Sequence, residues 1–212
     1  MNSSPKTTIY LVRHGQTVLN AQVRFRGRMD VPLNEIGRSE AIAAGIALRD
    51  KGLSAVYASP LIRAREVGTA IAAASGVPAV EDLDQLVNLH YGRWEGLTKE
   101  ESEEDDPQEW SLYLDDPERC TCPDGEKLAV AADRVVEGLR VIASRHPGQT
   151  VAAVSHGVML RLAVLRTAGQ IGDDWQFKMP TGAALVFEVM NGEISFVGPT
   201  WESELGAPLL TR

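Results

Sequence analysis

The sequence predicts an α/β protein: a three-layer αβα sandwich built on a mostly parallel sheet with an antiparallel edge. Short apolar runs at 9–12, 55–58 and 151–154 alternate with longer stretches of helical spacing, and this order favours parallel strands joined by helices. Near the carboxyl end, the runs 184–190 and 194–197 flank an Asn-Gly pair, which is a hairpin signal. This hairpin supplies the antiparallel edge.

Capping residues and helix breakers indicate where the helices begin and end. Asn34 is a suitable N-cap, and Gly52 ends the helix that it starts. Ser59 and Pro60 have the residue types of an N-cap and a first helical turn. On these signals and on apolar spacing, we expect helices over 35–50, 60–74, 129–145 and 157–168.

The length of 212 residues fits one domain over 1–212. The region at about 98–126 is the best candidate for an insertion, because it is acidic and contains Trp110. Such a charge run is more often a solvated face than a functional patch, although its place between core elements also suits a lid. The tail 198–212 has three open roles: packing on the body, joining a homodimer, or fraying.

Composition excludes several classes of partner. The net charge of −8 argues against a nucleic acid or an anionic membrane held by general electrostatics. No apolar run approaches the ~18 residues of a membrane span. Cys120 and Cys122, separated by one residue, suit neither a framework disulfide nor a four-ligand zinc site. We therefore expect a cytoplasmic protein with reduced thiols and no bound metal.

Two histidines follow predicted strands in the same way. His14 and His156 each stand just beyond a strand and before a glycine. Because ligands of open parallel sheets bind beyond the carboxyl ends of the strands, the two side chains are expected to share a site. Arg13 precedes one histidine, and Arg63 falls on the first turn of a predicted helix, where free N–H groups attract anions. Together these residues indicate a phosphate pocket.

The residue types suit phosphoryl transfer. A phosphoryl group accumulates charge during transfer, and Arg13, Arg63 and a protonated His156 would offset that charge. A neutral imidazole is a competent nucleophile, and Gly15 lets the backbone and the substrate approach His14 closely. Thr17 and Asn20 offer further polar contacts to phosphate oxygens.

An ordered set of motifs from about residue 9 to residue 187 resembles the histidine phosphatase superfamily, also called the phosphoglycerate mutase-like family. A bare Arg-His-Gly is a weak signal, whereas this ordered set is specific. The matching segments are Leu11-Val12-Arg13-His14-Gly15-Gln16-Thr17 with Asn20, Arg24 to Leu33 leading to Gly37, Ser59-Pro60-Leu61-Ile62-Arg63-Ala64, Tyr91-Gly92-Arg93-Trp94-Glu95-Gly96, Pro123-Asp124-Gly125-Glu126 and Val154-Ser155-His156-Gly157.

The resemblance implies a phosphoglycerate mutase-like fold and a phosphohistidine mechanism without cofactor or metal, acting on a small phosphorylated molecule. By this mapping His14 attacks the phosphoryl group, and water then hydrolyses the covalent intermediate. The residues implied to hold the phosphoryl group are Arg13, Arg63, His156, Asn20 and Gly157.

Arg26 and Gly27 are implied to lie at the mouth of the site, near the rest of the substrate. The alternation of Arg24, Arg26 and Arg28 also fits the solvent side of an extended segment, and for Arg24 and Arg28 the two interpretations are about even. Arg26 is the stronger candidate of the three for a substrate contact.

The residues after Tyr91-Gly92 favour hydrolysis over mutase activity. Trp94-Glu95-Gly96 resembles the phosphatase branch, and Leu97-Thr98-Lys99 stands where glycolytic mutases usually show Asn-Lys after a leucine-rich stretch. A mutase must also retain a bisphosphate and return the phosphoryl group. A mutase-type phosphotransferase remains an alternative.

Asn88 departs from the family pattern. Relatives usually have a carboxylic acid four residues before the glycine of this motif, where it protonates the leaving oxygen, and an amide cannot do so. His90 is one candidate for a replacement donor near the substrate, and Asp82, Asp84 and Glu126 are weaker ones. Asn88 also supports a second alternative, a catalytically weak protein that binds a phosphorylated ligand.

Overall fold

The computed structural model describes residues 5–168 and 175–199 and confirms the α/β class. A six-stranded sheet has the order β3-β2-β4-β1-β5-β6. Strands β1 to β4 are parallel, whereas β5 pairs antiparallel with both β1 and β6. The strands are β1 (Thr7–Arg13), β2 (Leu53–Ala58), β3 (Val80–Asp82), β4 (Thr150–Ser155), β5 (Ala184–Met190) and β6 (Glu193–Pro199).

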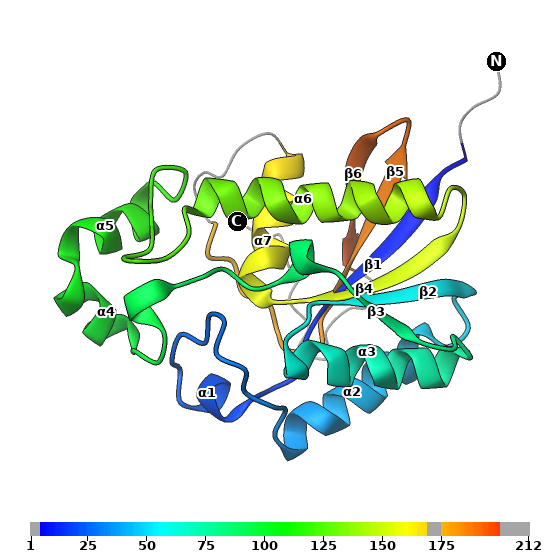
Figure 1. Cartoon of the computed structure of the whole chain (residues 1–212), viewed down its shortest axis with the longest axis horizontal. Coiled ribbons are helices and arrows are strands. Elements are labelled where there is room, and N and C mark those ends of the chain that lie inside the picture. The colour runs from blue at the N-terminus through cyan, green and yellow to red at the C-terminus, as the bar shows by residue number, and fades with distance from the viewer. Residues whose placement is uncertain (1–4, 169–174, 200–212) are drawn as a thin grey trace.

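Helices cover both faces of this sheet (Figure 1). On one face, α6 (Leu128–Arg145) and α7 (Gly157–Thr167) pack on alternate strand residues such as Ile9 and Leu11. On the other face, α2 (Glu35–Leu48) and α3 (Ile62–Ser75) pack on the residues between them, such as Val12. The period of two along each buried strand therefore produces two apolar cores and three layers.

Several predicted boundaries differ from the structure. Asn34 caps α2 as expected, through a bond from the Gly37 N–H. Ser59 does not cap α3; the N-cap is Leu61, and the helix begins at Ile62. The short strand β3 was not predicted, because its exposed polar residues lack the apolar run that marks a buried strand.

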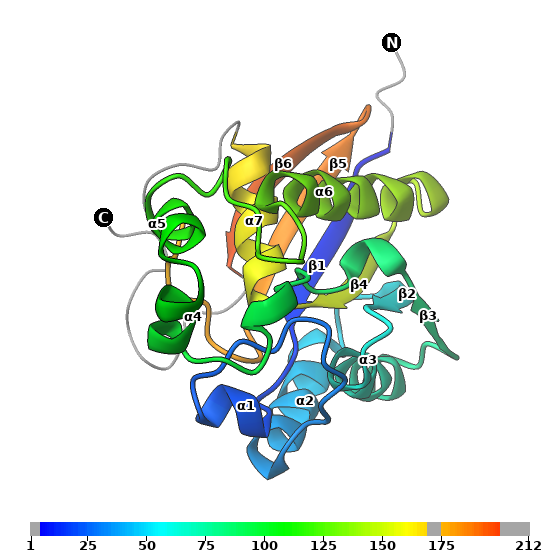
Figure 2. The same cartoon turned by 60° about the vertical axis from the view of Figure 1, so that its left-hand side comes forward.

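The proposed insertion lies to one side of the sheet and contains two short helices (Figure 2). Helix α4 (Lys99–Asp105) ends before Pro107, which opens α5 (Pro107–Asp115). Trp110 and Tyr113 of α5 pack in an aromatic cluster with Trp94, Trp175 and Phe25. Trp94 and Trp110 thus belong to the core rather than to an open surface.

The remaining elements are short. Helix α1 (Val18–Ala21) follows β1, and two 3-10 turns occupy Asp84–Leu86 and Gly92–Trp94. Within the described ranges, no helix combines the length and the apolar character that crossing a bilayer requires. Residues 200–212 of the tail lie outside the described residues.

Candidate active site

The pairing of β1 with β4 brings the two histidines together. Arg13, the last residue of β1, is in register with Ser155, the last residue of β4. His14 and His156 are the next residues, and their rings lie 5.1 Å apart between centroids. The backbone N–H of His14 donates to the Ser155 carbonyl at 3.0 Å, which continues the ladder into the site. The predicted meeting of the two strand ends is therefore present.

His14 has the geometry of a nucleophile. Its Nδ1 lies 2.6 Å from the carbonyl oxygen of Gly15, so Nδ1 carries the proton and Nε2 retains a lone pair. The Nε–H of Arg63 donates toward that Nε2 over 3.3 Å. The ring is only 1% exposed. The free nitrogen therefore faces a guanidinium and not bulk water.

Gly15 has a structural use beyond the open approach that the sequence suggested. A Cβ at this position would lie 2.5 Å from the carbonyl oxygen of Gly37. A Cβ at Gly37 would in turn lie 2.1 Å from the carbonyl oxygen of Gln16. Two glycines therefore allow the start of α2 to contact the backbone beside His14.

Arg63 connects His14 to the loop before α2. Its two terminal nitrogens donate to the carbonyls of Met29 at 2.7 Å and Gly27 at 2.8 Å. The side chain is completely buried on the first turn of α3. Burial, with the charge of Arg26, lowers the pKa of Arg63 to about 10, so it remains a cation at neutral pH. Gly27 thus orients Arg63 through its carbonyl.

His156 is held by Ser59. The sequence predicts Ser59 as a helix cap and does not indicate this contact. Nε2 of His156 lies 2.8 Å from Oγ of Ser59, at the end of β2. Nδ1 of His156 is buried and has no hydrogen-bond partner among the described residues. This nitrogen is consequently available to a bound ligand.

Both histidines are neutral in the ligand-free site. Burial and the charge of Arg63 hold the pKa of His14 and of His156 well below the usual value. Neutrality suits His14 as a nucleophile. A cation at His156 would lie beside Arg63 without a counter-charge, so the protonated His156 expected from the sequence stays a prediction for the phosphate-bound site. A phosphate dianion would favour the protonated form again.

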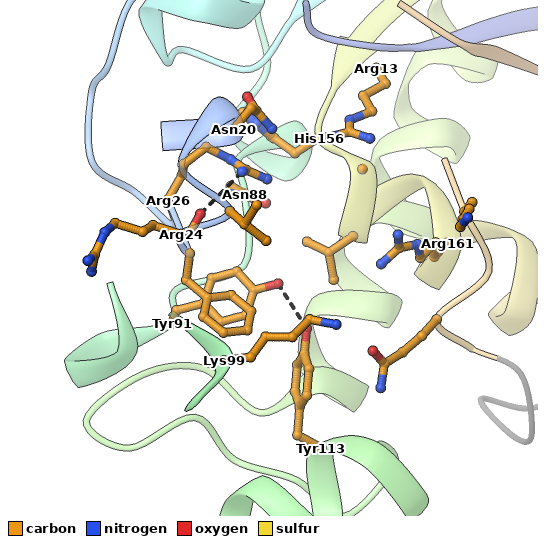
Figure 3. Close-up of a pocket in the computed structure, with 16 residues that line it drawn as sticks. Arg13, Asn20, Arg24, Arg26, Asn88, Tyr91, Lys99, Tyr113, His156 and Arg161 are labelled. Atoms are coloured by element: carbon orange, nitrogen blue, oxygen red, sulfur yellow. Dashed lines mark hydrogen bonds between the residues drawn. The ribbon is translucent and has the colours of Figure 1, made fainter. Parts of the chain in front are cut away.

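A cavity of about 430 Å³ opens next to His156. It is lined by six arginine and lysine side chains, and no carboxylate is part of its lining among the residues that the structure describes. Figure 3 shows several of these side chains around it. The six are Arg13, Arg24, Arg26, Lys99, Arg161 and Lys178. Such a lining selects an anionic ligand.

Two of these arginines stand near the histidines. Arg13 donates to the carbonyl of Met179, and its buried Nε has no hydrogen-bond partner among the described residues. Burial and the charge of Arg26 lower the pKa of Arg13 to about 9. Arg26 donates to the carbonyl of Arg24 at 3.2 Å. A Cβ at Gly157 would lie 3.0 Å from Nε of Arg13, so the glycine lets α7 begin against this guanidinium.

Asn88 lines the cavity with its amide oxygen free. Its Nδ2 donates to the Gly27 carbonyl at 3.0 Å, whereas its buried Oδ1 has no partner among the described residues. Arg134 fixes the chain here by donating to the carbonyls of Val87 and Asn88 at 2.8 and 3.3 Å. The amide therefore presents an acceptor to the cavity, where a protonated acid would present a donor.

Some of the other predicted residues line the cavity, one positions a lining residue, and the rest lie outside the lining. Asn20 and Gly157 line the cavity. Thr17 is buried, and its hydroxyl bonds to Asn20, so it positions that residue. The His90 side chain is 40% exposed, lies 3.9 Å from Glu95 and is not part of the lining. The weaker donor candidates Asp82, Asp84 and Glu126 are also absent from it.

Several lining residues were missed from the sequence, among them Arg161, Tyr113, Gln176 and Lys178. Arg161 lies four residues after Gly157, so helical spacing alone could have placed it on the same side of α7. Tyr113, Gln176 and Lys178 come from segments whose path depends on long-range packing. No pattern near them in the sequence indicates the cavity.

Within the described ranges, no group of three or more His, Cys, Asp or Glu side chains is arranged to hold a metal ion. Cys120 and Cys122 are both buried and unpaired as a disulfide.

The family model of the histidine phosphatase superfamily (branch 1) matches residues 9–201. The chain belongs to this superfamily. It is 36% identical over 165 residues to the metal-independent phosphoserine phosphatase of Arabidopsis thaliana, covering 77% of this chain and 69% of the relative.

Two further comparisons agree. The chain is 40% identical over 163 residues to the bifunctional protein Rv2228c of Mycobacterium tuberculosis; the match covers 74% of this chain but only 44% of that protein. The solved structure of YhfR from Bacillus stearothermophilus aligns with a TM-score of 0.82 at 31% identity, covering 90% of this chain and 95% of the other. The predicted family and fold are thereby confirmed.

Proposed function

We propose that this chain is a metal-independent phosphatase that hydrolyses a small phosphomonoester through a phosphohistidine on His14. The observation that carries the proposal is the arrangement of His14. Its Nε2 is unprotonated and lies 3.3 Å from Nε of Arg63, and its ring lies beside that of His156, which lines a cationic cavity. The similarity to a metal-independent phosphoserine phosphatase supports it.

The two chemical steps follow from these positions. Nε2 of His14 forms a bond to phosphorus while the bond from phosphorus to the leaving oxygen breaks, and that oxygen takes up a proton from solvent water. For attack to occur, Arg63 exchanges its bond to Nε2 for a phosphoryl oxygen. Water then attacks phosphorus, which releases phosphate and restores neutral His14. Arg13 and His156 stabilise the charge on the phosphoryl oxygens in both steps.

Donation of a proton to the leaving group is the step that this site favours least. The Asn88 amide has no acidic proton to give to a leaving oxygen, and none of the cavity-lining side chains among the described residues is a carboxylic acid. A substrate with a good leaving group, or a slow turnover, fits this arrangement. Asn88 also favours a second candidate function, a protein that binds a phosphorylated ligand and turns it over poorly.

Phosphate release from a panel of phosphorylated metabolites, including phosphoserine and para-nitrophenyl phosphate, tests the proposal. A phosphatase releases phosphate repeatedly from at least one compound. Tight binding with one turnover or none identifies the binding protein. Activity that appears only after priming with a bisphosphate identifies the mutase alternative. One relative, the 2,3-bisphosphoglycerate-dependent phosphoglycerate mutase of Novosphingobium aromaticivorans, supports this alternative by its name at 30% identity.

The free, buried thiols of Cys120 and Cys122 support action in a reducing compartment, and we propose the cytoplasm.

A further inference from the structure

Glu95 binds the backbone of the loop that holds Arg63, although it does not line the cavity. Its Oε1 accepts the backbone N–H of Arg28 at 3.0 Å and that of Tyr91 at 3.2 Å. The side chain is only 16% exposed, so the carboxylate makes these bonds largely away from water. The proposed phosphoryl transfer gives Glu95 no part.

The Arg28 N–H and the Gly27 carbonyl belong to one peptide group, here called the linking peptide. This group is planar and trans, so its N–H and its C=O point in opposite directions. Glu95 accepts the N–H on one side, and on the other side the carbonyl accepts from Arg63 at 2.8 Å. Asn88 donates to the same carbonyl at 3.0 Å. The plane of the linking peptide therefore connects Glu95 to the guanidinium beside the nucleophile.

Gly27 does not fix this plane by itself. Its φ of +49° lies in the left-handed region that glycine adopts without a steric penalty, and a Cβ here would overlap the Glu95 carboxylate. The same lack of a Cβ leaves the linking peptide free to turn once its N–H has no acceptor.

Other contacts hold the ends of the loop without Glu95. The Gly96 N–H donates to the Phe25 carbonyl at 2.8 Å, and Asp30 accepts the Ile62 N–H at 2.7 Å. Neither bond involves the linking peptide. Loss of the Glu95 carboxylate should therefore turn one peptide group and leave the surrounding fold in place.

The acceptor oxygen of Glu95 matters more than its charge. Burial and the charge of Arg26 lower the pKa of Arg63 to about 10, whereas Asp30 and, to a lesser extent, Glu95 raise it. Arg63 thus stays a cation at neutral pH without the charge of Glu95. The position of the guanidinium, and not its protonation, depends on this carboxylate.

We propose that Glu95 is a positioning residue: it fixes the linking peptide so that the Gly27 carbonyl holds Arg63 at Nε2 of His14. This inference rests on the proposed phosphatase function and adds a residue outside the cavity to the reaction. Without the Oε1 acceptor, the guanidinium loses one of its three partners.

Three variants separate the acceptor from the charge. E95A removes both, and we expect it to lower kcat for para-nitrophenyl phosphate by up to about 10²-fold, with KM changed less than about threefold. E95Q keeps an acceptor of the same reach without the charge and should retain most of kcat. E95D keeps the charge on a shorter side chain and should lose kcat.

A double-mutant cycle shows whether Glu95 acts through Arg63. Adding E95A to R63Q should lower kcat by less than about twofold more, because the guanidinium is already absent. E109A is the matched control and should leave kcat unchanged, since Glu109 also accepts a backbone N–H, that of Thr121 at 2.8 Å, but does not line the cavity. Effects of E95A and R63Q that multiply would overturn the assignment.

The NMR resonance of His14 Nε2 gives a readout that needs no turnover. At about pH 8, where the histidines are neutral, E95A and E95D should move this resonance toward the position of an imidazole nitrogen that receives no hydrogen bond. E95Q and E109A should not move it. A shift confined to E95A and E95D supports the assignment even if E95A is poorly folded and only E95D can be compared.

An unchanged kcat and an unchanged His14 resonance in E95A would overturn the assignment. A loss in E95Q as large as that in E95A would overturn it too. If the unmodified chain turns over no phosphorylated compound, the phosphatase proposal fails alone, because the resonance still tests whether Glu95 holds Arg63 in place.

Discussion

Nε of Arg63 lies 3.3 Å from Nε2 of His14, and the two other nitrogens of the same guanidinium hold the carbonyls of Met29 and Gly27. One buried cation thus occupies the position where a phosphoryl oxygen would arrive and fixes the loop beside it. In the proposed mechanism, this arrangement keeps His14 neutral and places a positive charge beside its Nε2 before the substrate binds.

Replacing Arg63 should therefore impair chemistry more than binding. We expect R63Q to lower kcat about 10²- to 10³-fold, as removal of a donor to a developing charge does in other enzymes. R63K should recover only part of this loss, because lysine lacks the planar fork that reaches three partners. Steady-state kinetics with para-nitrophenyl phosphate measure both variants. R65Q, at an exposed arginine of the same helix paired with Asp82, should behave like the unmodified chain. Full activity of R63Q would contradict the role of Arg63.

Asn88 should limit the range of usable leaving groups. We expect N88E to raise the rate on alkyl phosphates more than on aryl phosphates, by up to the 10²- to 10⁴-fold typical of general acid catalysis. An aryl oxide leaves readily without a proton, so it gains less. The ratio of kcat/KM for ethyl phosphate and phenyl phosphate measures the effect, and N88Q, which keeps an amide, is the control. Equal effects on both esters would place Asn88 outside the acid position.

The buried histidines should make the ligand-free protein sensitive to acid. The pKa of both His14 and His156 is held well below its usual value by burial, whereas in the unfolded chain both titrate near the ordinary value of about 6.5. Below about pH 6.5 the unfolded state therefore binds more protons. The free energy of unfolding should fall as pH falls, by at most about 1.4 kcal/mol per pH unit for each histidine.

Chemical denaturation between pH 7.5 and pH 5 measures this slope. The double variant H14Q/H156Q should show a shallower pH dependence than the unmodified chain, because neither glutamine titrates. Saturating inorganic phosphate should also flatten the slope of the unmodified chain, since the anion favours the protonated form of His156. An unchanged slope in the double variant would show that other groups dominate.

Metal chelation should leave the rate unchanged, because the proposed mechanism draws its positive charge from Arg13, Arg63 and His156. We expect the same kcat before and after treatment with EDTA, and no stimulation by added Mg²⁺. Release of phosphate from para-nitrophenyl phosphate, followed in both conditions, measures this. Strong inhibition that added metal reverses would defeat the metal-free mechanism.

The part of the site built by strand ends could be predicted from the sequence. His14 and His156 were placed together correctly because parallel strands align their carboxyl ends, and short apolar runs mark those strands. The residues that line the cavity away from these strand ends could not be predicted in this way. Tyr113 belongs to α5, and its place at the cavity depends on packing against Trp110 and Trp175.

The prediction that Ser59 is a helix cap was wrong for a different reason. Its residue type and position before a proline fit a helix cap, and local preference alone favours that role. In the structure its hydroxyl lies 2.8 Å from His156, a residue 97 positions away, while α3 begins at Ile62 without it. The hydroxyl still accepts a local hydrogen bond from the Leu61 N–H at 3.4 Å, but its contact with His156 is long-range, and only the folded sheet reveals that contact.

Trapping the covalent intermediate tests the central claim most directly. The protein is mixed with para-nitrophenyl phosphate, quenched within one turnover under alkaline conditions that preserve phosphohistidine, digested and examined by mass spectrometry. We expect a phosphoryl group on His14, and none in H14A. Sustained phosphate release by H14A, or a phosphoryl group on His156 with His14 unmodified, would contradict the mechanism.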